Sequence, residues 1–314
     1  MIKPRCAFVN ADDIRLHYLE WDQQVIHQMQ QRSEQGQIAD AANDNIPLVM
    51  LHGLGATAHT WSLVADHLYQ EHLVIAFDLR GHGKSEQPAQ GYDMVTIAED
   101  VISGMAALGL GQVALIGQGW GARVALVIAA RHPALISHLI LVDCPHIEPR
   151  HWPGMTRERF IREKAVPESY ASQATFIEAI KDEMSAFWSP EVEAIVKTYV
   201  HELPDGRVEE RLQAAHQRQI RESFWDERAL PYYGKLSCPV LLVPAATEPQ
   251  LDEDLPERLE SADEFAVAKG HIANQVARTI HRCSVLWMPE TVHDIQLQRP
   301  QVLAENIASF VARS

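Results

Sequence analysis

Six short apolar runs recur along the chain from residue 46 onward, and helical patterns separate most of them. Runs in which nearly every residue is apolar suit strands buried on both faces of a parallel sheet. Their alternation with helical patterns is typical of strand–helix–strand units and predicts a doubly wound α/β sheet. The runs are Pro47–Leu51, Leu73–Phe77, Val113–Ile116, His138–Val142, Val240–Val243 and Ser284–Met288. The clearest helical patterns are Trp61–Tyr69, Val95–Leu108, Ala122–Arg131, Phe265–Ile280 and Gln301–Arg313.

Segments outside this alternation divide the chain further. Cys6–Val9 and Ile14–Trp21 predict a β-hairpin, and the Gln-rich residues 22–45 predict an exposed polar insertion within the core. Residues 146–234 show apolar helical faces and no strand-like run, which predicts a helical cap. Residues 1–145 and 235–314 would then form the α/β core. A cap over the carboxyl edge of the sheet would roof a pocket, because open α/β sheets bind ligands there.

Charge and cysteine content narrow the possible partners. The chain has 27 basic and 42 acidic residues and a net charge of −15. Nucleic acids and anionic membranes bind clusters of Lys and Arg, so we expect neither as a partner of this acidic chain. The charge does not argue against a small-molecule partner. Four scattered cysteines predict no metal site and no disulfide framework, and no cofactor is indicated. The first residues lack the apolar region of a signal peptide, so we expect a cytoplasmic protein.

The stretch LIGQGWGARVALVIAARHP, from Leu115 to Pro133, predicts a strand, a Gly-rich turn and a helix. This is the layout of a nucleophile elbow, whose Gly-x-Ser-x-Gly pattern lifts a reactive side chain out of a sheet. Gly117 and Gly121 are in place, but the middle position is Gly119, which has no side chain. A dinucleotide-binding turn is disfavoured, because its G-x-G-x-x-G pattern needs the third glycine one residue later.

Three further loops follow predicted strands. His52-Gly53-Leu54-Gly55 (HGLG) could present backbone N–H groups to a cleft, as an oxyanion hole requires. Residues 78–85 (DLRGHGKS) lack the first glycine of a phosphate-binding loop, so we expect a structural turn whose Asp and Arg tie loops together. Residues 289–295 (PETVHDI) would bring His293 to the carboxyl edge, beside the elbow. A lone histidine is usually structural, so His293 gains weight only from the other motifs.

HGLG, DLRGHGKS, GQGWGARVAL and HDIQLQRP stand in the order and context of the α/β-hydrolase superfamily. The chain resembles this superfamily from about Ile14 to the C-terminus, except for residues 22–45. Within it, the chain is similar to small esterases and C–C-bond hydrolases that carry a helical cap. The resemblance implies an eight-stranded, mostly parallel sheet in which the first hairpin supplies the antiparallel strand.

The same resemblance implies roles for individual residues. The family's chain order is nucleophile, acid, base, which gives the base position to His293. The backbone N–H groups of Leu54 and Trp120 would form the oxyanion hole. The acid falls on Asp143 or on Glu248: residue type favours Asp143, and the usual position in the family favours Glu248.

Relatives carry Ser at the position of Gly119, and a branch that opens epoxides or displaces halide carries Asp there. Loss of a serine nucleophile costs on the order of 10⁶ in turnover, so ordinary covalent ester hydrolysis is not expected. Three hypotheses remain. The protein binds a small, mostly apolar molecule without catalysis, or His293 supports altered chemistry, or Gly119 was introduced by mutation into an active serine hydrolase. Cys144 lies near the same edge, where we expect a buried, inert thiol.

Overall fold

An eight-stranded sheet runs through the part of the chain that the structure describes, in the order β1-β2-β4-β3-β5-β6-β9-β10. This structure is a computed structural model that describes residues 1–21, 46–144, 148–151, 154–162, 169–249 and 262–313. The predicted insertion at 22–45 lies outside the described residues. The strands are β1 (Arg5–Ala11), β2 (Ile14–Trp21), β3 (Leu48–Leu51), β4 (Val74–Phe77), β5 (Val113–Gln118), β6 (Ile136–Val142), β9 (Val240–Val243) and β10 (Cys283–Val285).

The strand directions confirm the predicted sheet. β2 runs antiparallel to both of its neighbours, β1 and β4, and each remaining pair of neighbouring strands is parallel. The strands β3, β4, β5 and β9 are buried along their whole length, as their continuous apolar runs predicted. β1 lies at an edge and exposes most of its residues.

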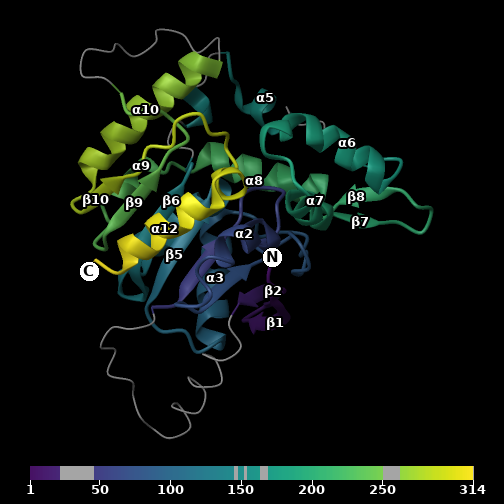
Figure 1. The fold of residues 1–314 in the computed structure, drawn as a ribbon, viewed down its shortest axis with the longest axis horizontal. Coiled ribbons are helices and arrows are strands. Elements are labelled where there is room, and N and C mark those ends of the chain that lie inside the picture. Colours follow the sequence, from purple (N-terminus) through teal and green to yellow (C-terminus); the bar gives the residue numbers. More distant parts are fainter. Residues whose placement is uncertain (22–45, 145–147, 152–153, 163–168, 250–261, 314) are drawn as a thin grey trace, which may run out of the picture.

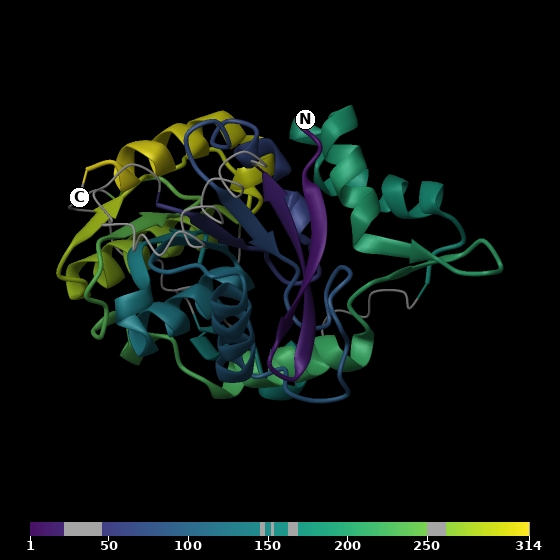
Figure 2. The same ribbon diagram turned by 90° about the horizontal axis from the view of Figure 1, so that it is seen from below.

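Helices cover both faces of the sheet (Figures 1 and 2). They are α2 (Ser62–Ala65), α3 (Met94–Ala107), α4 (Trp120–Arg131), α9 (Leu230–Tyr233), α10 (Ala262–Thr279), α11 (Ile295–Gln298) and α12 (Pro300–Val311). One apolar core lies between the sheet and α3, α4, α9 and α10, and a second lies between the sheet and α2, α11 and α12. Among the described helices, none combines the length and apolarity needed to span a lipid bilayer.

The described chain between β6 and the end of α8 forms a separate layer beside the sheet, which we call the cap (Figure 1). Its elements are α5 (Arg157–Arg162), α6 (Gln173–Glu183), α7 (Pro190–Val196), β7 (Val200–Glu202), β8 (Val208–Glu210) and α8 (Ala214–Asp226). The cap has a small apolar core of its own, built from Phe176, Val192, Val196, Val200 and Val208.

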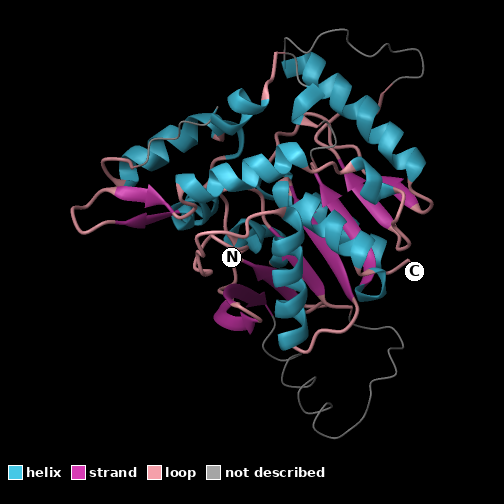
Figure 3. Cartoon of the chain, turned by 180° about the vertical axis from the view of Figure 1, so that it is seen from behind, coloured by secondary structure: helices cyan, strands magenta, loops and turns pink. Residues whose placement is uncertain are grey.

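The cap is mainly helical, and it also contains a short antiparallel sheet of β7 and β8 that the sequence analysis did not anticipate (Figure 3). Each strand has three residues and buries one of them, Val200 or Val208. Strands this short carry too few residues for the alternation that identifies a half-buried strand. The turn between them contains Gly206 at φ 84°, and its Pro-Asp-Gly sequence is a turn signal that marks the hairpin.

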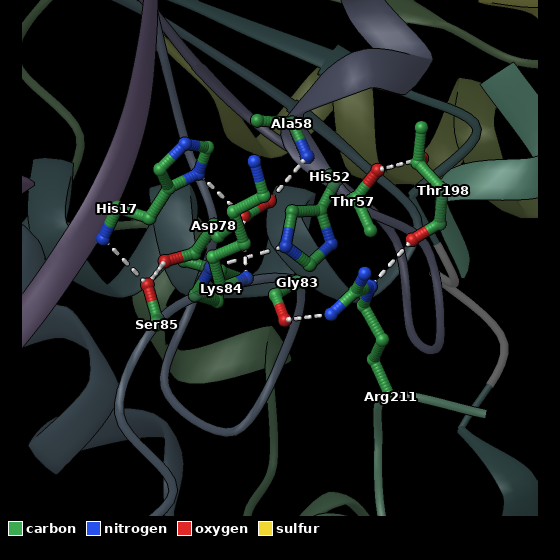
Figure 4. Close-up of polar contacts among 11 residues, drawn as sticks. His17, His52, Thr57, Ala58, Asp78, Gly83, Lys84, Ser85, Thr198 and Arg211 are labelled. Carbon is green, nitrogen blue, oxygen red and sulfur yellow. Dashed lines mark hydrogen bonds and ion pairs between the residues drawn. The ribbon is translucent and has the colours of Figure 1, made fainter. Parts of the chain in front are cut away.

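The loop at 78–85 is structural, as predicted, and Asp78 is its centre (Figure 4). The carboxylate of Asp78 accepts hydrogen bonds from the backbone N–H groups of Ala58 at 2.7 Å and Lys84 at 2.9 Å. It also lies 2.7 Å from Nδ1 of His17. A β-carbon on Gly83 would overlap this carboxylate, so the turn requires glycine there.

The cap is tied to the core through the same loops (Figure 4). The hydroxyl groups of Thr57 and Thr198 lie 2.7 Å apart. Arg211, just after β8, donates to the carbonyl of Thr198 at 2.9 Å and to the carbonyl of Gly83 at 3.5 Å. These contacts hold the cap against the loops that follow β3 and β4.

Candidate active site at the carboxyl edge of the sheet

Gly119 forms the tip of the turn between β5 and α4. Its backbone has φ 54° and ψ −115°, in the left-handed range that favours glycine. The flanking glycines allow the strand and helix to approach closely. A β-carbon on Gly117 would overlap the carbonyl of Gly121, and one on Gly121 would overlap the carbonyl of His52. The turn therefore has the sharp strand-to-helix geometry of an elbow, with no side chain at its tip.

His293 lies directly opposite this tip, in the loop that precedes α11. A β-carbon built on Gly119 would lie 2.8 Å from His293 Nε2 and 3.1 Å from Cε1. The imidazole therefore stands closer to residue 119 than a side chain there would comfortably allow. The backbone carbonyl of His293 accepts a hydrogen bond from Gln118 Nε2 at 3.2 Å, which ties the loop to the end of β5.

The carboxylate beside His293 belongs to Asp143, which directly follows β6. His293 Nδ1 donates to Asp143 Oδ2 at 2.6 Å, and the backbone N–H of Ala245 donates to Oδ1 at 3.0 Å. Glu248, the other candidate for the acid, is exposed on the chain beyond β9. Of the two carboxylates that the sequence left open, the structure therefore brings Asp143 to the imidazole.

Lys269, on α10, is a member of this group that the sequence analysis missed. Its Nζ lies 3.1 Å from Asp143 Oδ2, the same oxygen that accepts from His293. No motif surrounds Lys269 in the sequence, because the contact depends on where α10 packs. Gln118 was missed too, although its place next to Gly119 in the elbow was a usable signal.

The charges of these groups shift their proton affinities. Burial raises the pKa of Asp143, but hydrogen bonding to His293 and the charge of Lys269 outweigh it and lower this pKa to about 2. Burial also lowers the pKa of His293, but the hydrogen bond and charge of Asp143, together with the charge of Asp294, raise it above the usual value. Lys269 opposes that rise. Asp143 is thus a carboxylate at neutral pH, and His293 holds its second proton more firmly than a free histidine.

A cavity of about 540 Å³ opens above Gly119, and both the core and the cap line it. Its lining includes Leu54, Trp120 and His293, and the His293 side chain is 55% exposed. The backbone N–H of Trp120 opens α4 and so has no acceptor within that helix. Leu54, from the HGLG loop, and Trp120, at the start of α4, therefore both line the cavity together with Gly119.

The cap supplies the apolar wall of the cavity. It contributes Phe160, Phe176, Ile180, Met184, Ile220 and Phe224. Gln217 lies one turn before Ile220 and Arg221 on the α8 face that lines the cavity, and it is buried.

Cys144 lines the cavity, but its chemistry is that of an inert thiol. The side chain is buried, and its Sγ lies 3.6 Å from the hydroxyl of Tyr233. Burial raises the pKa of the thiol to about 12, so the nucleophilic thiolate is not formed at neutral pH. Within the described residues, no group of three or more His, Cys, Asp or Glu side chains is placed to hold a metal ion.

Comparison with known proteins agrees with this architecture. Residues 46–188 match the family model described as the alpha/beta hydrolase fold. The chain is 39% identical over 102 residues to a soluble epoxide hydrolase of Corynebacterium sp., which is 32% of this chain and 36% of that protein. It is 33% identical over 101 residues to epoxide hydrolase 4 of Mus musculus, which is 32% of this chain and 28% of that protein. The chain thus matches about a third of the length of these curated relatives.

Similarity to solved structures covers nearly the whole chain. E-2-(Acetamidomethylene)succinate hydrolase superposes with a TM-score of 0.74 and 18% identity, over 98% of this chain and 99% of that one. The thioesterase domain of the curacin biosynthetic pathway superposes with a TM-score of 0.71 and 17% identity, over 98% and 100% of the two chains. Together with the strand order and the elbow, these comparisons show that the chain has the α/β-hydrolase fold.

Proposed function

We propose that the protein binds a small, mostly apolar molecule in the cavity under the cap and performs no covalent ester hydrolysis. The observation that carries this proposal is the composition of the cavity floor. His293 and Asp143 are hydrogen-bonded above Gly119, where the fold would carry a nucleophile and this chain carries no side chain. The partners of a nucleophile are assembled, but the attacking atom is missing.

The rest of the cavity supports ligand binding. Its volume of about 540 Å³ is that of an ordinary small-molecule site. Its wall combines aromatic and aliphatic side chains with charged ones, which are Asp143, Glu183, Glu210, Arg221, Lys269, His293 and Asp294. None of the described lining residues is Ser or Thr, and the thiol of Cys144 stays protonated. The hydroxyl and thiolate nucleophiles that commonly carry out covalent ester hydrolysis are therefore missing from this surface.

Chemistry based on His293 is the second candidate, and the 2.6 Å bond to Asp143 favours it. With Nδ1 donating to Asp143, the Nε2 atom of the neutral imidazole can accept a proton from water. Water would then attack a bound ester, lactone or epoxide, while the N–H groups of Leu54 and Trp120 stabilise the developing oxyanion. Epoxides belong among the test substrates because epoxide hydrolases are among the curated relatives.

A substrate panel separates the two candidates. The purified protein is incubated with short-chain esters, lactones and styrene oxide, and both product formation and saturable binding are measured. Binding without turnover supports the non-catalytic function. Catalysis by His293 is supported if the protein turns over a substrate and His293→Ala abolishes this turnover. The control His67→Ala, at an exposed site, should leave the turnover intact. If the protein neither binds nor converts any compound of the panel, both candidate functions are contradicted.

A further inference from the structure

The groups around His293 determine whether its Nε2 atom accepts or donates a hydrogen bond. Asp143, Asp294 and Lys269 are the charged groups that act on the imidazole. Because Nδ1 donates to Asp143, the neutral imidazole has a bare Nε2 that can only accept a hydrogen bond. Protonation places a second N–H on Nε2 and turns that atom into a donor facing Gly119.

Protonated His293 leaves the cavity floor with donors and no matching acceptor. The N–H groups of Leu54 and Trp120 have no protein acceptor among the described residues. In an active serine hydrolase the nucleophile's oxygen would accept from the imidazole, but Gly119 has no oxygen to offer. Three N–H donors then line the cavity without a protein acceptor, so a ligand that brings acceptor atoms can replace water there and form three hydrogen bonds.

We infer that the space above Gly119 binds the carboxylate of a small amphiphilic acid, with its apolar body along the cap wall. This inference rests on the proposed function. One carboxylate oxygen accepts from Nε2 of protonated His293, and the other accepts from the N–H groups of Leu54 and Trp120. A carboxylate offers two acceptor atoms and no donor, which matches this set of three donors.

Lys269 does not serve as the counter-ion in this arrangement. Its ammonium group already lies 3.1 Å from Asp143 Oδ2 and compensates that charge. Asp143, Asp294, Lys269 and protonated His293 sum to zero charge before a ligand enters. Glu183, Glu210 and Arg221, which also line the cavity, add a net charge of −1, and loss of the His293 proton adds another. Binding therefore depends on directed hydrogen bonds from a protonated His293, and a neutral His293 repels the anion.

The test compares an acid with its neutral ester by isothermal titration calorimetry. Hexanoate and methyl hexanoate share an apolar chain, and hexanoate stays ionised from about pH 5.5 to about pH 9. We expect hexanoate to bind most tightly near pH 5.5. Above the pKa of His293, its affinity should fall about tenfold for each pH unit. Methyl hexanoate should bind with an affinity that does not change with pH.

Variants assign the effect to His293. His293→Gln keeps a polar side chain but cannot be protonated, so hexanoate should bind about tenfold to a hundredfold more weakly at low pH. Its affinity should also become independent of pH. His67→Gln, at an exposed position, should match the unchanged protein. Thermal melts of each variant establish that it is folded.

The outcomes separate this inference from the proposed function. If acid and ester bind equally at every pH, the protein binds apolar molecules and the carboxylate site is wrong. If pH-dependent binding of hexanoate persists in folded His293→Gln, another group binds the anion and the inference is overturned. If neither probe binds, the proposed function fails along with it.

Discussion

Nε2 of His293 lies 2.8 Å from the place that a β-carbon on residue 119 would occupy. Real β-carbons are not found this close to a nitrogen that is not bonded to them. The imidazole therefore occupies space that a β-carbon on residue 119 would need. The neighbour is the tip of a side chain, however, and a shift of a few tenths of an ångström would relieve the contact. Gly119 and His293 therefore fit each other as they stand, yet the site can accommodate a small side chain.

Gly119→Ser tests whether the remaining machinery can still support covalent catalysis. We expect the unchanged protein to show no burst with p-nitrophenyl acetate and no labelling by a fluorophosphonate probe, and Gly119→Ser to show both. The left-handed backbone at φ 54° should cost the variant about 1–3 kcal/mol of stability, measured by urea unfolding.

Gly119→Ala is the matched control for that variant, because it carries the same strain and no hydroxyl group. It should lose similar stability and remain unlabelled. Stoichiometric labelling of the unchanged protein would reveal a nucleophile elsewhere. A folded Gly119→Ser that stays unlabelled would mean that His293 and the two backbone N–H groups no longer have the geometry of a serine hydrolase.

Asp143→Asn should weaken the protein in a pH-dependent way. A pKa lowered from 3.8 to about 2 corresponds to about 2–3 kcal/mol of stability, because each unit is worth about 1.4 kcal/mol. A lowered carboxyl pKa stabilises the fold above the unfolded value and loses this contribution as pH falls through the folded value. The unfolding free energy of Asp143→Asn should therefore differ most from that of the unchanged protein at pH 7, and the difference should shrink as the pH falls toward about 2. Asp226→Asn, which breaks an exposed pair with Arg157, should change stability little.

Lys269→Met should raise the pKa of His293, because the ammonium group opposes protonation of the imidazole. Imidazole resonances followed by NMR over a pH titration measure this directly and need no substrate. Lys3→Met removes the same charge from an exposed position near the N-terminus and should leave the titration of His293 unchanged. An unchanged or lowered pKa in Lys269→Met would show that Lys269 does not act on the Asp143–His293 pair.

The sheet could be predicted from the sequence, because a strand buried on both faces is a continuous run of apolar residues. β3, β4 and β9 are runs of apolar residues with no polar interruption, and such runs can be recognised without knowing what packs on them. The elbow was predictable for a similar reason. Gly117 and Gly121 mark the backbone positions at which any side chain would collide with neighbouring backbone atoms.

The choice of carboxylate could not be made from the sequence. Asp143 and Glu248 both follow strands, β6 and β9, that lie side by side in the parallel sheet. Both therefore reach the same edge, and only the packing of the loops decides which one meets His293. Lys269 shows the same limit, since its contact with Asp143 spans 126 residues and depends on how α10 docks.

Gly121→Ala should destabilise the fold much more than its single added methyl group suggests. The β-carbon would overlap the backbone carbonyls of Leu51 and His52, so β3 or α4 would have to move. Overpacking of this kind typically costs about 1–3 kcal/mol, and we expect the upper end because backbone cannot rotate away as a side chain can. Gly234→Ala is the matched control, because its β-carbon meets no heavy atom within 4 Å and its φ is −70°. The control should be neutral or slightly stabilising, since alanine restricts the unfolded chain. Equal urea midpoints for the two variants would show that the close approach of α4 to β3 is not needed to form the elbow.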